Sequence, residues 1–458
     1  MPRVFLKEQW KQLGFLAQIE DKPVPEDRSS GFSDPCFASN KTLPIHRWVP
    51  WIAGFSSSFV KDALNKYLQR KGIILDPFSG VGTTLVEAII GGHSAIGFEI
   101  NPYAALACRT KVNAHRIDAG ALYAETARLR SFWQEKSQSG YVPATLPPMG
   151  FKTRAAFYSP KVLYKVLIIQ DFIKTIGDSD LRDLFRLAFA STMVTYSNYS
   201  YEPSLGRRVS AGREEIEDFP VFQTILNKLA EFVEDIVWLA SSLPQHGQSA
   251  EVINDSFLRC KDHLAPESVD LIVTSPPYLN NYHYNRNTRP HLYWLGFAHQ
   301  PDDLQRLEHM NFGKYWQTVR EQACVDLEFS LPDSDLAQRL QALRGLNPEK
   351  GIYGGNGWAN YAASYFNDCY KFAEGIGYVL KPGARALVVI GNSILHGVLI
   401  PTDQYFGHIA ANLGLELVQI HLPRATRVGN SIIQSDVRVA KAHRAHQLYE
   451  AVVELRKR

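Results

Sequence analysis

One stretch of this 458-residue chain constrains its fold more than any other: GIILDPFSGVGTTLVEAIIGG, which begins at Gly72. Ile73–Leu75 is short, apolar and β-branched, which is typical of a buried parallel strand. Gly80 and Gly82 follow it, and they allow the backbone to turn tightly and to approach a ligand closely. Leu85–Ile90 then predicts a helix that ends at a pair of glycines. This order predicts an α/β protein, because parallel strands need crossover helices.

The remaining strand signals are spread over the chain and extend this unit into one mostly parallel sheet. They lie at Ser94–Phe98, Glu251–Ile253, Val269–Thr274 and Arg385–Gly391. The stretch that follows Val269–Thr274, up to residue 357, is rich in loop signals. A helix with one apolar face is expected at Trp358–Leu380. Near the end of the chain we expect a hairpin formed by Leu415–His421 and Val437–Ala440.

Between the second and third strands the pattern changes to helical apolar spacing. Four helices are expected there: Ala119–Lys136, Pro160–Thr175, Leu181–Tyr196 and Phe219–Ala240. We therefore expect an N-terminal arm (1–45), a catalytic core (46–115 and 250–445) and a helical insertion (116–249) that contributes to target recognition. Residues 197–218 of the insertion form a long loop rich in Ser, Gly and Arg, and such loops are usually functional or disordered.

Composition narrows the class of protein. No stretch approaches the roughly 18 uninterrupted apolar residues of a membrane span, and the start of the chain lacks a signal-peptide pattern. The 5 cysteines include no CxxC pair, and the 14 histidines show no metal-ligand spacing. This pattern suits a reducing cytoplasm and argues against a zinc framework. We expect a cytoplasmic protein that needs neither a membrane nor a metal.

The net charge of +3 permits nucleic-acid binding without arguing for it, since a basic footprint is usually local. Three clusters of arginine are candidate nucleic-acid contacts, although solvated surface explains each of them equally well. The clusters are Arg207, Arg208 and Arg213; Arg286 and Arg289; and Arg424 and Arg427.

An acidic residue ends the second strand. Glu99 lies in GFEINP, seventeen residues after Gly82. A carboxylate in this position can accept hydrogen bonds from both ribose hydroxyls of a nucleotide-like cofactor. A purely structural glycine turn is the alternative, and the position of Glu99 disfavours it.

A second motif follows the strand Val269–Thr274: the tetrad Ser275, Pro276, Pro277 and Tyr278. Two prolines remove two backbone donors and fix φ twice, which gives a rigid bend with its carbonyls free. The lone pair of an exocyclic amine on a base is delocalised into the ring, so the amine is a poor nucleophile. Acceptors such as Ser275 Oγ and the Pro276 carbonyl can draw this nitrogen toward tetrahedral geometry, while Tyr278 stacks on a flipped base.

DPFSGVGTT, GFEINP and TSPPY together resemble the amino-methyltransferases of DNA, over roughly residues 41–115 and 250–440. The resemblance implies the class I methyltransferase fold, a Rossmann-like seven-stranded sheet, with S-adenosylmethionine as cofactor and double-stranded DNA as substrate. A tetrad led by Ser resembles the enzymes that methylate the 4-amino group of cytosine. The resemblance to this family also implies a role in a restriction-modification system with a cognate restriction endonuclease, or a role as a solitary methylase.

The resemblance also implies which residues form the site. The segment HRWVPWIAGFSSSFV is similar to one that closes over the methionine end of the cofactor, and Asp255 is expected at its adenine. The full set of expected cofactor-binding residues is Asp76, Phe78, Gly80, Gly82, Thr83, Thr84, Glu99, Asn101, Asp255 and Ser256. The expected catalytic residues are the four of the tetrad.

Several alternatives stay open. Adenine-N6 methylation of DNA is the nearest, and RNA base or protein glutamine methylation is more remote because those tetrads usually begin with Asp or Asn. Methylation of a ring carbon needs a thiolate, and Cys36 in the only Pro-Cys pair has no partner motif. A DNA-binding scaffold with a decayed site conflicts with the intact motifs. Target recognition is open between 197–218, 298–357 and 424–427.

Overall fold

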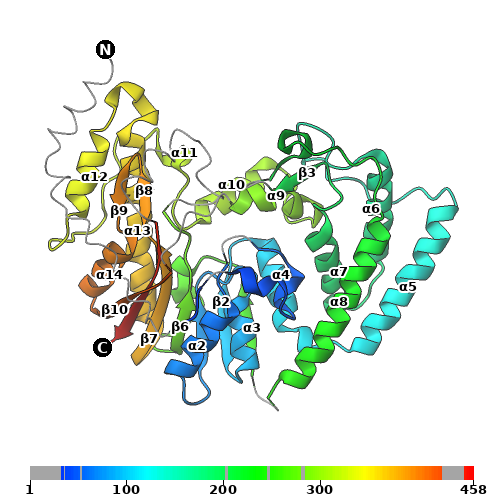
Figure 1. Ribbon diagram of the computed structural model, residues 1–458, viewed down its shortest axis with the longest axis horizontal. Helices are drawn as coiled ribbons and strands as arrows, with labels where there is room; N and C mark the ends of the chain where they lie inside the picture. The colour runs from blue at the N-terminus through cyan, green and yellow to red at the C-terminus, as the bar shows by residue number, and fades with distance from the viewer. Residues whose placement is uncertain are drawn as a thin grey trace.

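The computed structural model describes residues 32–35, 37–51, 54–201, 205–244, 248–279, 284–424 and 448–458. Its centre is a seven-stranded sheet in the order β10-β11-β7-β6-β1-β2-β5 (Figure 1). The strands are β1 (Ile73–Asp76), β2 (Ser94–Phe98), β5 (Ala250–Ile253), β6 (Val269–Thr274), β7 (Leu380–Gly391), β10 (Leu415–Arg424) and β11 (Glu450–Lys457). Adjacent strands from β7 to β5 in this order are parallel, and β11 runs antiparallel to both β7 and β10. This is the α/β class I methyltransferase sheet that the sequence predicts.

The strand β11 corrects the expected hairpin. β10 pairs with Glu450–Lys457 and not with Val437–Ala440, which lies outside the described residues. The sheet therefore continues past residue 445. Because β11 lies between two other strands, it is apolar on both faces: Ala451, Val452 and Val453 are all buried.

Helices cover both faces of the sheet. Along β1, Ile74 points into one core and Leu75 into the other, as the alternation of a strand requires. The first core contains α2 (Ser57–Tyr67), α3 (Thr83–Ile90) and α4 (Pro102–Val112). The second contains α13 (Gly355–Val379) and α14 (Thr402–Asn412).

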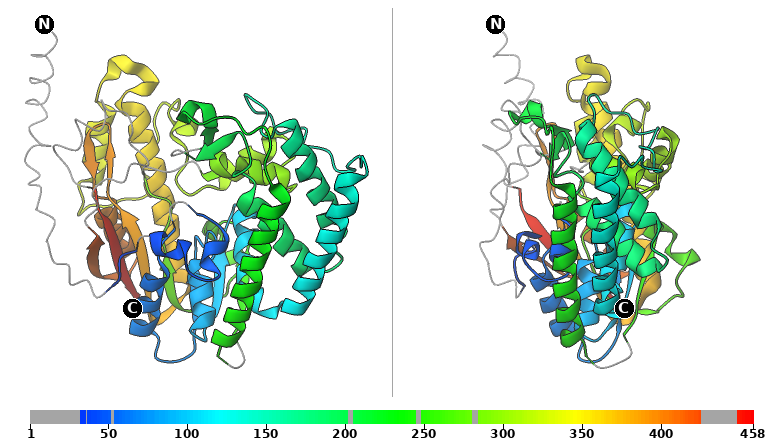
Figure 2. Two further views of the ribbon diagram at one scale, coloured as in Figure 1. Left: turned by 45° about the vertical axis from the view of Figure 1, so that its right-hand side comes forward. Right: turned by 90° about the vertical axis from the view of Figure 1, so that its right-hand side faces the viewer.

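Four helices between β2 and β5 form a block beside the sheet, on the side of its β5 edge (Figures 1 and 2). They are α5 (Ala119–Gln138), α6 (Pro160–Lys174), α7 (Ser179–Thr192) and α8 (Val221–Ser242). Each lies within a few residues of its predicted position, except that α7 stops at Thr192 rather than Tyr196. The expected long loop holds a short hairpin, β3 (Tyr199–Tyr201) with β4 (Leu205–Arg207), and a 3-10 turn, η4 (Arg208–Ala211).

The stretch expected to be loop-rich contains α9 (Tyr284–Trp294), α10 (Pro301–Met310), α11 (Trp316–Val319) and α12 (Leu336–Arg344). A further hairpin joins β8 (Ser393–Leu395) to β9 (Val398–Ile400). Within the expected N-terminal arm, η1 (Phe37–Lys41) is a 3-10 helix, and η2 (His46–Trp48) follows just after it. These elements are short, and several are polar, so their apolar periodicity is weak.

Candidate active site

The glycine loop joins β1 to α3 at the carboxyl end of the parallel strands. Gly80 and Gly82 have φ of 51° and 89°, in the left-handed region that favours glycine. A Cβ on Gly80 would lie 3.2 Å from Trp51 Nε1, so Trp51 covers this part of the loop. A Cβ on Gly82 would lie 2.7 Å from Cys108 Sγ and 3.3 Å from its Cα in α4. Gly82 therefore lets α3 pack against α4, and the approach of a ligand to both glycines stays a prediction.

Glu99 lies beside the glycine loop at the end of β2. Its Oε2 accepts a 2.9 Å hydrogen bond from the Gly80 amide, and its Oε1 accepts one of 2.7 Å from the Asn101 amide. Asn254 Nδ2 donates to the Glu99 carbonyl at 2.6 Å, which ties β5 to the same corner. Burial raises the pKa of Glu99 to about 7, although the two backbone hydrogen bonds oppose this rise. The carboxyl group of Glu99 is thus held at the glycine loop by two backbone amides.

Asp76, the last residue of β1, connects the glycine loop to the tetrad. Its Oδ1 accepts hydrogen bonds from Thr274 Oγ1 at 2.6 Å and from the Phe78 amide at 3.0 Å. Its Oδ2 is buried and has no hydrogen-bond partner among the described residues. Burial raises the pKa of Asp76 to about 6, against the hydrogen bonds that lower it. The side chain therefore has one oxygen committed to the fold and one left for a donor.

The tetrad begins directly after β6, next to the glycine loop. Ser275 lines a small cavity together with Trp51, Phe55, Phe78, Ser79 and Gly80. The Pro277 carbonyl accepts a 3.0 Å hydrogen bond from Tyr365 Oη in α13. Tyr278 lies against Gly391 at the end of β7, where a Cβ would come within 3.3 Å of the ring. The sheet thus brings Ser275 to the cofactor loop although almost 200 residues separate them.

The chain before α2 lines this cavity and is anchored to α3 and to α8. Buried Asn40 donates to the Phe55 carbonyl at 3.1 Å and to Thr83 Oγ1 at 3.4 Å. Asp235 of α8 accepts hydrogen bonds from the Ile45 amide at 2.7 Å and from Trp48 Nε1 at 2.9 Å. Sequence reasoning missed Asn40 and Asp235, since neither lies in a motif.

Comparison with known proteins gives relatives along most of the chain. The Type II methyltransferase M.BsoBI of Geobacillus stearothermophilus is 24% identical over 86% of this chain and 83% of its own length. M.MvaI of Kocuria varians is 22% identical over 72% of both chains, and M.AvaI of Anabaena variabilis is 23% identical over 86% and 84%. A family model described as DNA methylase, N6_N4_Mtase, matches residues 27–108, which hold the glycine loop and Glu99. The chain is therefore similar to DNA amino-methyltransferases along most of its length.

S-adenosylmethionine is the cofactor of this methyltransferase, and the residues of the site fit it. Asp76 Oδ2 is a buried acceptor with no partner among the described residues, Glu99 offers a carboxylate, and Gly80 brings backbone close beneath Trp51. Thr83 and Thr84 lie at the start of α3, where Thr84 Oγ1 is fixed by the Val273 carbonyl at 3.2 Å. Phe78 closes the far side, packed edge-on against Phe312 and Phe372 with centroids 5.1 Å apart.

Some of the expected cofactor residues also have partners within the protein. Asn101 caps α4 by accepting from the Tyr103 amide at 3.0 Å, and its Nδ2 donates to Thr288 Oγ1 in α9 at 2.7 Å. Asp255 Oδ2 lies 2.8 Å from His263 Nε2 and 3.2 Å from Arg259 Nη1. Burial raises the pKa of Asp255, but these partners and the Ser256 amide outweigh burial and hold it below its usual value. Contact of Asp255 with the cofactor adenine stays a prediction.

The arginine clusters of the methyltransferase have mixed surroundings. Arg207 pairs with Glu215 at 3.1 Å, and Arg208 Nε donates to the Glu214 carbonyl at 3.0 Å. Arg213 and Arg286 are exposed, and Arg289 lies over the rings of Phe151 and Tyr293. Arg427 and the side chain of Arg424 lie outside the described residues, as does Cys36.

Two hydrogen bonds join α9 to the β3–β4 hairpin: from Tyr201 Oη to the Asn287 carbonyl at 3.1 Å, and from the Leu205 amide to Asn287 Oδ1 at 2.9 Å. Arg289 Nη2 also donates to the Lys152 carbonyl at 3.0 Å. Three stretches that are far apart in the sequence, near residues 152, 205 and 287, therefore lie in contact in the structure. The structure brings the first two arginine clusters together through these contacts, and it adds exposed Lys152 and Arg154 beside them.

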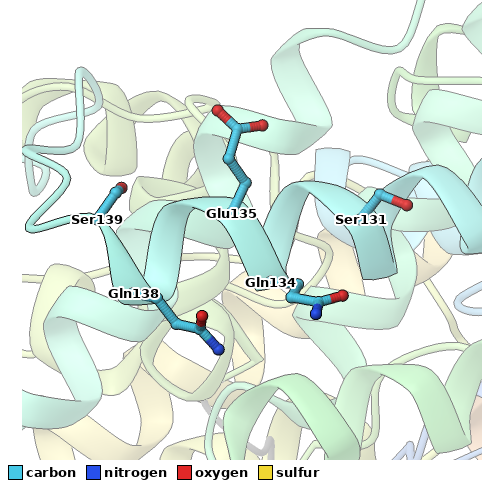
Figure 3. A pocket seen from close by; sticks show the side chains of 5 residues that line it. All are labelled: Ser131, Gln134, Glu135, Gln138 and Ser139. Carbon is cyan, nitrogen blue, oxygen red and sulfur yellow. The ribbon is translucent and has the colours of Figure 1, made fainter.

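Other features of the described part of the chain carry no chemistry for the site. Within it, no group of three or more His, Cys, Asp or Glu side chains is arranged to hold a metal ion. None of its helices has both the length and the apolar character of a membrane span. Figure 3 shows an open hollow on the outer side of α5, far from the glycine loop in Figure 1. It is lined only by polar side chains: Ser131, Gln134, Glu135, Gln138 and Ser139.

Proposed function

We propose that this DNA amino-methyltransferase methylates the 4-amino group of cytosine in double-stranded DNA, at a specific site, on a base turned out of the helix. The observation that carries this proposal is that Ser275 and the glycine loop line one cavity. A hydroxyl that leads the tetrad therefore lies beside the place where the methyl donor is held. The Ser-led tetrad supports cytosine over adenine.

Three residues of the site would each contact a different part of the cofactor. Glu99 would accept the ribose hydroxyls, Asp76 Oδ2 would accept a donor from the methionine end, and Trp51 would cover it. When bound, S-adenosylmethionine supplies an electrophilic methyl group on a sulfonium, which is already a good leaving group. Such chemistry needs no metal to activate it.

The tetrad would prepare the amine. Ser275 Oγ and the Pro276 carbonyl would accept the two N–H groups, which draws the nitrogen toward tetrahedral geometry and frees its lone pair for attack. The Pro277 carbonyl is already engaged by Tyr365, so Pro276 is the better candidate acceptor. Tyr278 would stack on the extruded base, a contact worth about 1–3 kcal/mol.

The position of Ser275 supports extrusion of the base from the duplex. Its cavity is small and enclosed by Trp51, Phe55 and Phe78, so an amine still paired inside a duplex would not reach the hydroxyl. The basic residues on the β3–β4 hairpin, α9 and the stretch 152–154 would hold DNA phosphates nearby. Target recognition is proposed for the helical block with this hairpin, or for 298–357.

The relatives are Type II methyltransferases, and we propose a role in restriction-modification, with a cognate endonuclease that cuts the unmethylated site. DNA methylated by the purified protein would then resist that endonuclease.

The test of the proposed function is direct. Purified protein is incubated with double-stranded DNA and labelled cofactor, and the DNA is digested to nucleosides for mass spectrometry. N4-methylcytosine is the expected product. N6-methyladenine without N4-methylcytosine would overturn the assignment of the base. Labelling of RNA but not of DNA would overturn the assignment of the substrate.

A further inference from the structure

We propose that Tyr365 is a positioning residue for methyl transfer, which fixes the orientation of the Ser-Pro-Pro-Tyr turn through the Pro277 carbonyl. This inference rests on the proposed function of the tetrad. Tyr365 lies in α13, almost 90 residues after the turn, and belongs to no motif.

The contact is direct and well held. Tyr365 Oη donates to the Pro277 carbonyl at 3.0 Å, and the side chain has no exposed surface. Its ring packs edge-on against Phe312 and Phe366, with centroids 5.4 and 5.6 Å apart. Phe312 in turn packs on Phe78 of the glycine loop. The donor therefore has little freedom to move relative to the cofactor loop.

The direction of one carbonyl matters in this turn. Both prolines have fixed φ, so the conformation of the turn depends mainly on the rotation of the peptide planes between them and after them. A hydrogen bond on the Pro277 carbonyl sets the plane that joins Pro277 to Tyr278. It thereby limits where the Tyr278 ring and the rest of the turn can lie.

The Tyr365 hydroxyl is suited to this task at all working pH values. Burial raises the pKa of Tyr365 well above its usual value, so the group stays protonated and remains a donor. At the other end of the turn, Tyr278 has little room, because its ring lies against Gly391. These two contacts hold the Tyr278 end of the turn, while Ser275 at its start lines the cavity.

Tyr365→Phe tests this inference, because it removes one oxygen and keeps the ring. The same helix offers a matched control, since Tyr378 Oη donates to the Leu264 carbonyl at 3.2 Å, away from the tetrad. Tyr378→Phe loses the same kind of bond, from a tyrosine to a backbone carbonyl, in the same element. For each variant we would measure kcat and KM for DNA, the affinity for the cofactor by calorimetry, and Tm.

Tyr365→Phe is expected to lower kcat about tenfold, while KM for DNA and cofactor affinity stay within about twofold of wild type. Tyr378→Phe is expected to keep kcat, with a similar small loss of Tm. An unchanged kcat in Tyr365→Phe would overturn the inference. Equal losses of kcat in the two variants, in proportion to their losses of Tm, would also overturn it. The effect of Tyr365→Phe would then come from lower stability. If the wild-type protein methylates no DNA, the proposed function fails instead, and this result is seen before any variant is made.

Discussion

Thr274 Oγ1 donates a 2.6 Å hydrogen bond to Asp76 Oδ1, across 198 residues of sequence. Thr274 is the last residue of β6 and Asp76 the last of β1, and the two strands are neighbours in the sheet. The bond therefore joins the start of the glycine loop to the start of the tetrad. In the proposed function these two loops would hold the cofactor and the base, and this contact adds to the pairing of β1 with β6 in keeping the loops together.

Thr274→Val should weaken this connection. The variant keeps the shape of the side chain but leaves a buried carboxylate with one donor fewer, which typically costs about 1–3 kcal/mol of unfolding free energy. We expect a lower Tm and a lower kcat. Thr110→Val is the control, since this buried threonine loses a 2.8 Å bond to the Leu106 carbonyl in α4 and has none to Asp76. Equal Tm and kcat in wild type and Thr274→Val would contradict the role given to this contact.

Cofactor affinity should depend on pH through Glu99. Its pKa is raised to about 7, so below that pH the free protein holds a proton on this carboxyl. Binding of the ribose hydroxyls to the ionised form must release the proton, so affinity should fall as the pH drops below about 7 and level off above it. Calorimetry from pH 5.5 to 8.5 measures this. Glu99→Gln should bind weakly and lose the pH dependence near pH 7, while Asp76, whose pKa is about 6, still contributes at the acid end of this range.

Asp255→Asn is the control for that experiment. The pKa of Asp255 lies below its usual value, so this group stays ionised throughout the same window. Its variant should keep the slope of affinity against pH that wild type shows. A slope that survives in Glu99→Gln would mean that another group binds the proton.

The motifs at the site could be predicted from sequence because each is a local signal. β2 and β6 have the predicted bounds, and the glycine loop lies between β1 and α3 as expected. Proline, glycine and β-branched residues act on their own backbone, so their effect is readable without neighbours.

The residues that sequence reasoning missed act through contacts with distant parts of the chain. Tyr365 and Asp235 lie on ordinary helical patterns, and Asn40 lies in the expected N-terminal arm. Only the fold brings these three residues to the tetrad, η2 and the glycine loop, respectively. β11 was missed because its Glu454 suggests an exposed position. That carboxylate is 4% exposed and is paired with both His421 and Arg385, which compensates for its burial.

Gly82→Ala should destabilise the protein by two effects. The residue has φ of 89°, which is strained for any side chain, and a Cβ would lie 3.3 Å from the Cys108 Cα. We expect Tm to fall and the cofactor loop to shift, so that cofactor affinity falls with it. Cys108→Ala in the same chain would remove the Sγ contact at 2.7 Å and should restore part of the Tm but not all of it. A variant as stable as wild type would refute the packing role of Gly82.

Removal of the arginines near the β3–β4 hairpin should weaken DNA binding. Arg207, Arg208 and Arg213 changed together to Ala should lower the slope of log affinity against log salt by about one for each lost phosphate contact. The control is a triple alanine variant with the same change in charge. It replaces Lys161, Lys165 and Arg128, each of which forms an ion pair with a nearby carboxylate. Binding measured at several salt concentrations separates the two. A slope that does not differ between the triple variants would place the DNA elsewhere.

Ser275→Ala is the most direct test of the chemistry. Ser275 Oγ is proposed to act on the amine as it becomes tetrahedral, so its loss should affect the transition state far more than the ground state. Removal of one such hydrogen-bond partner typically costs about 2.7–4 kcal/mol, or about a hundred- to thousandfold in kcat. Cofactor affinity should stay nearly unchanged.

Two further variants show whether that loss is specific to Ser275. Tyr278→Ala should raise KM for DNA and lower kcat together, because stacking holds the base both before and during transfer. Cys36→Ser should change nothing, since no thiolate attacks the ring when the acceptor is an amine. Rapid-quench kinetics with a single DNA site measures all three variants against wild type. A fully active Ser275→Ala beside an inactive Cys36→Ser would place the methyl group on a ring carbon, and amine methylation would then be wrong.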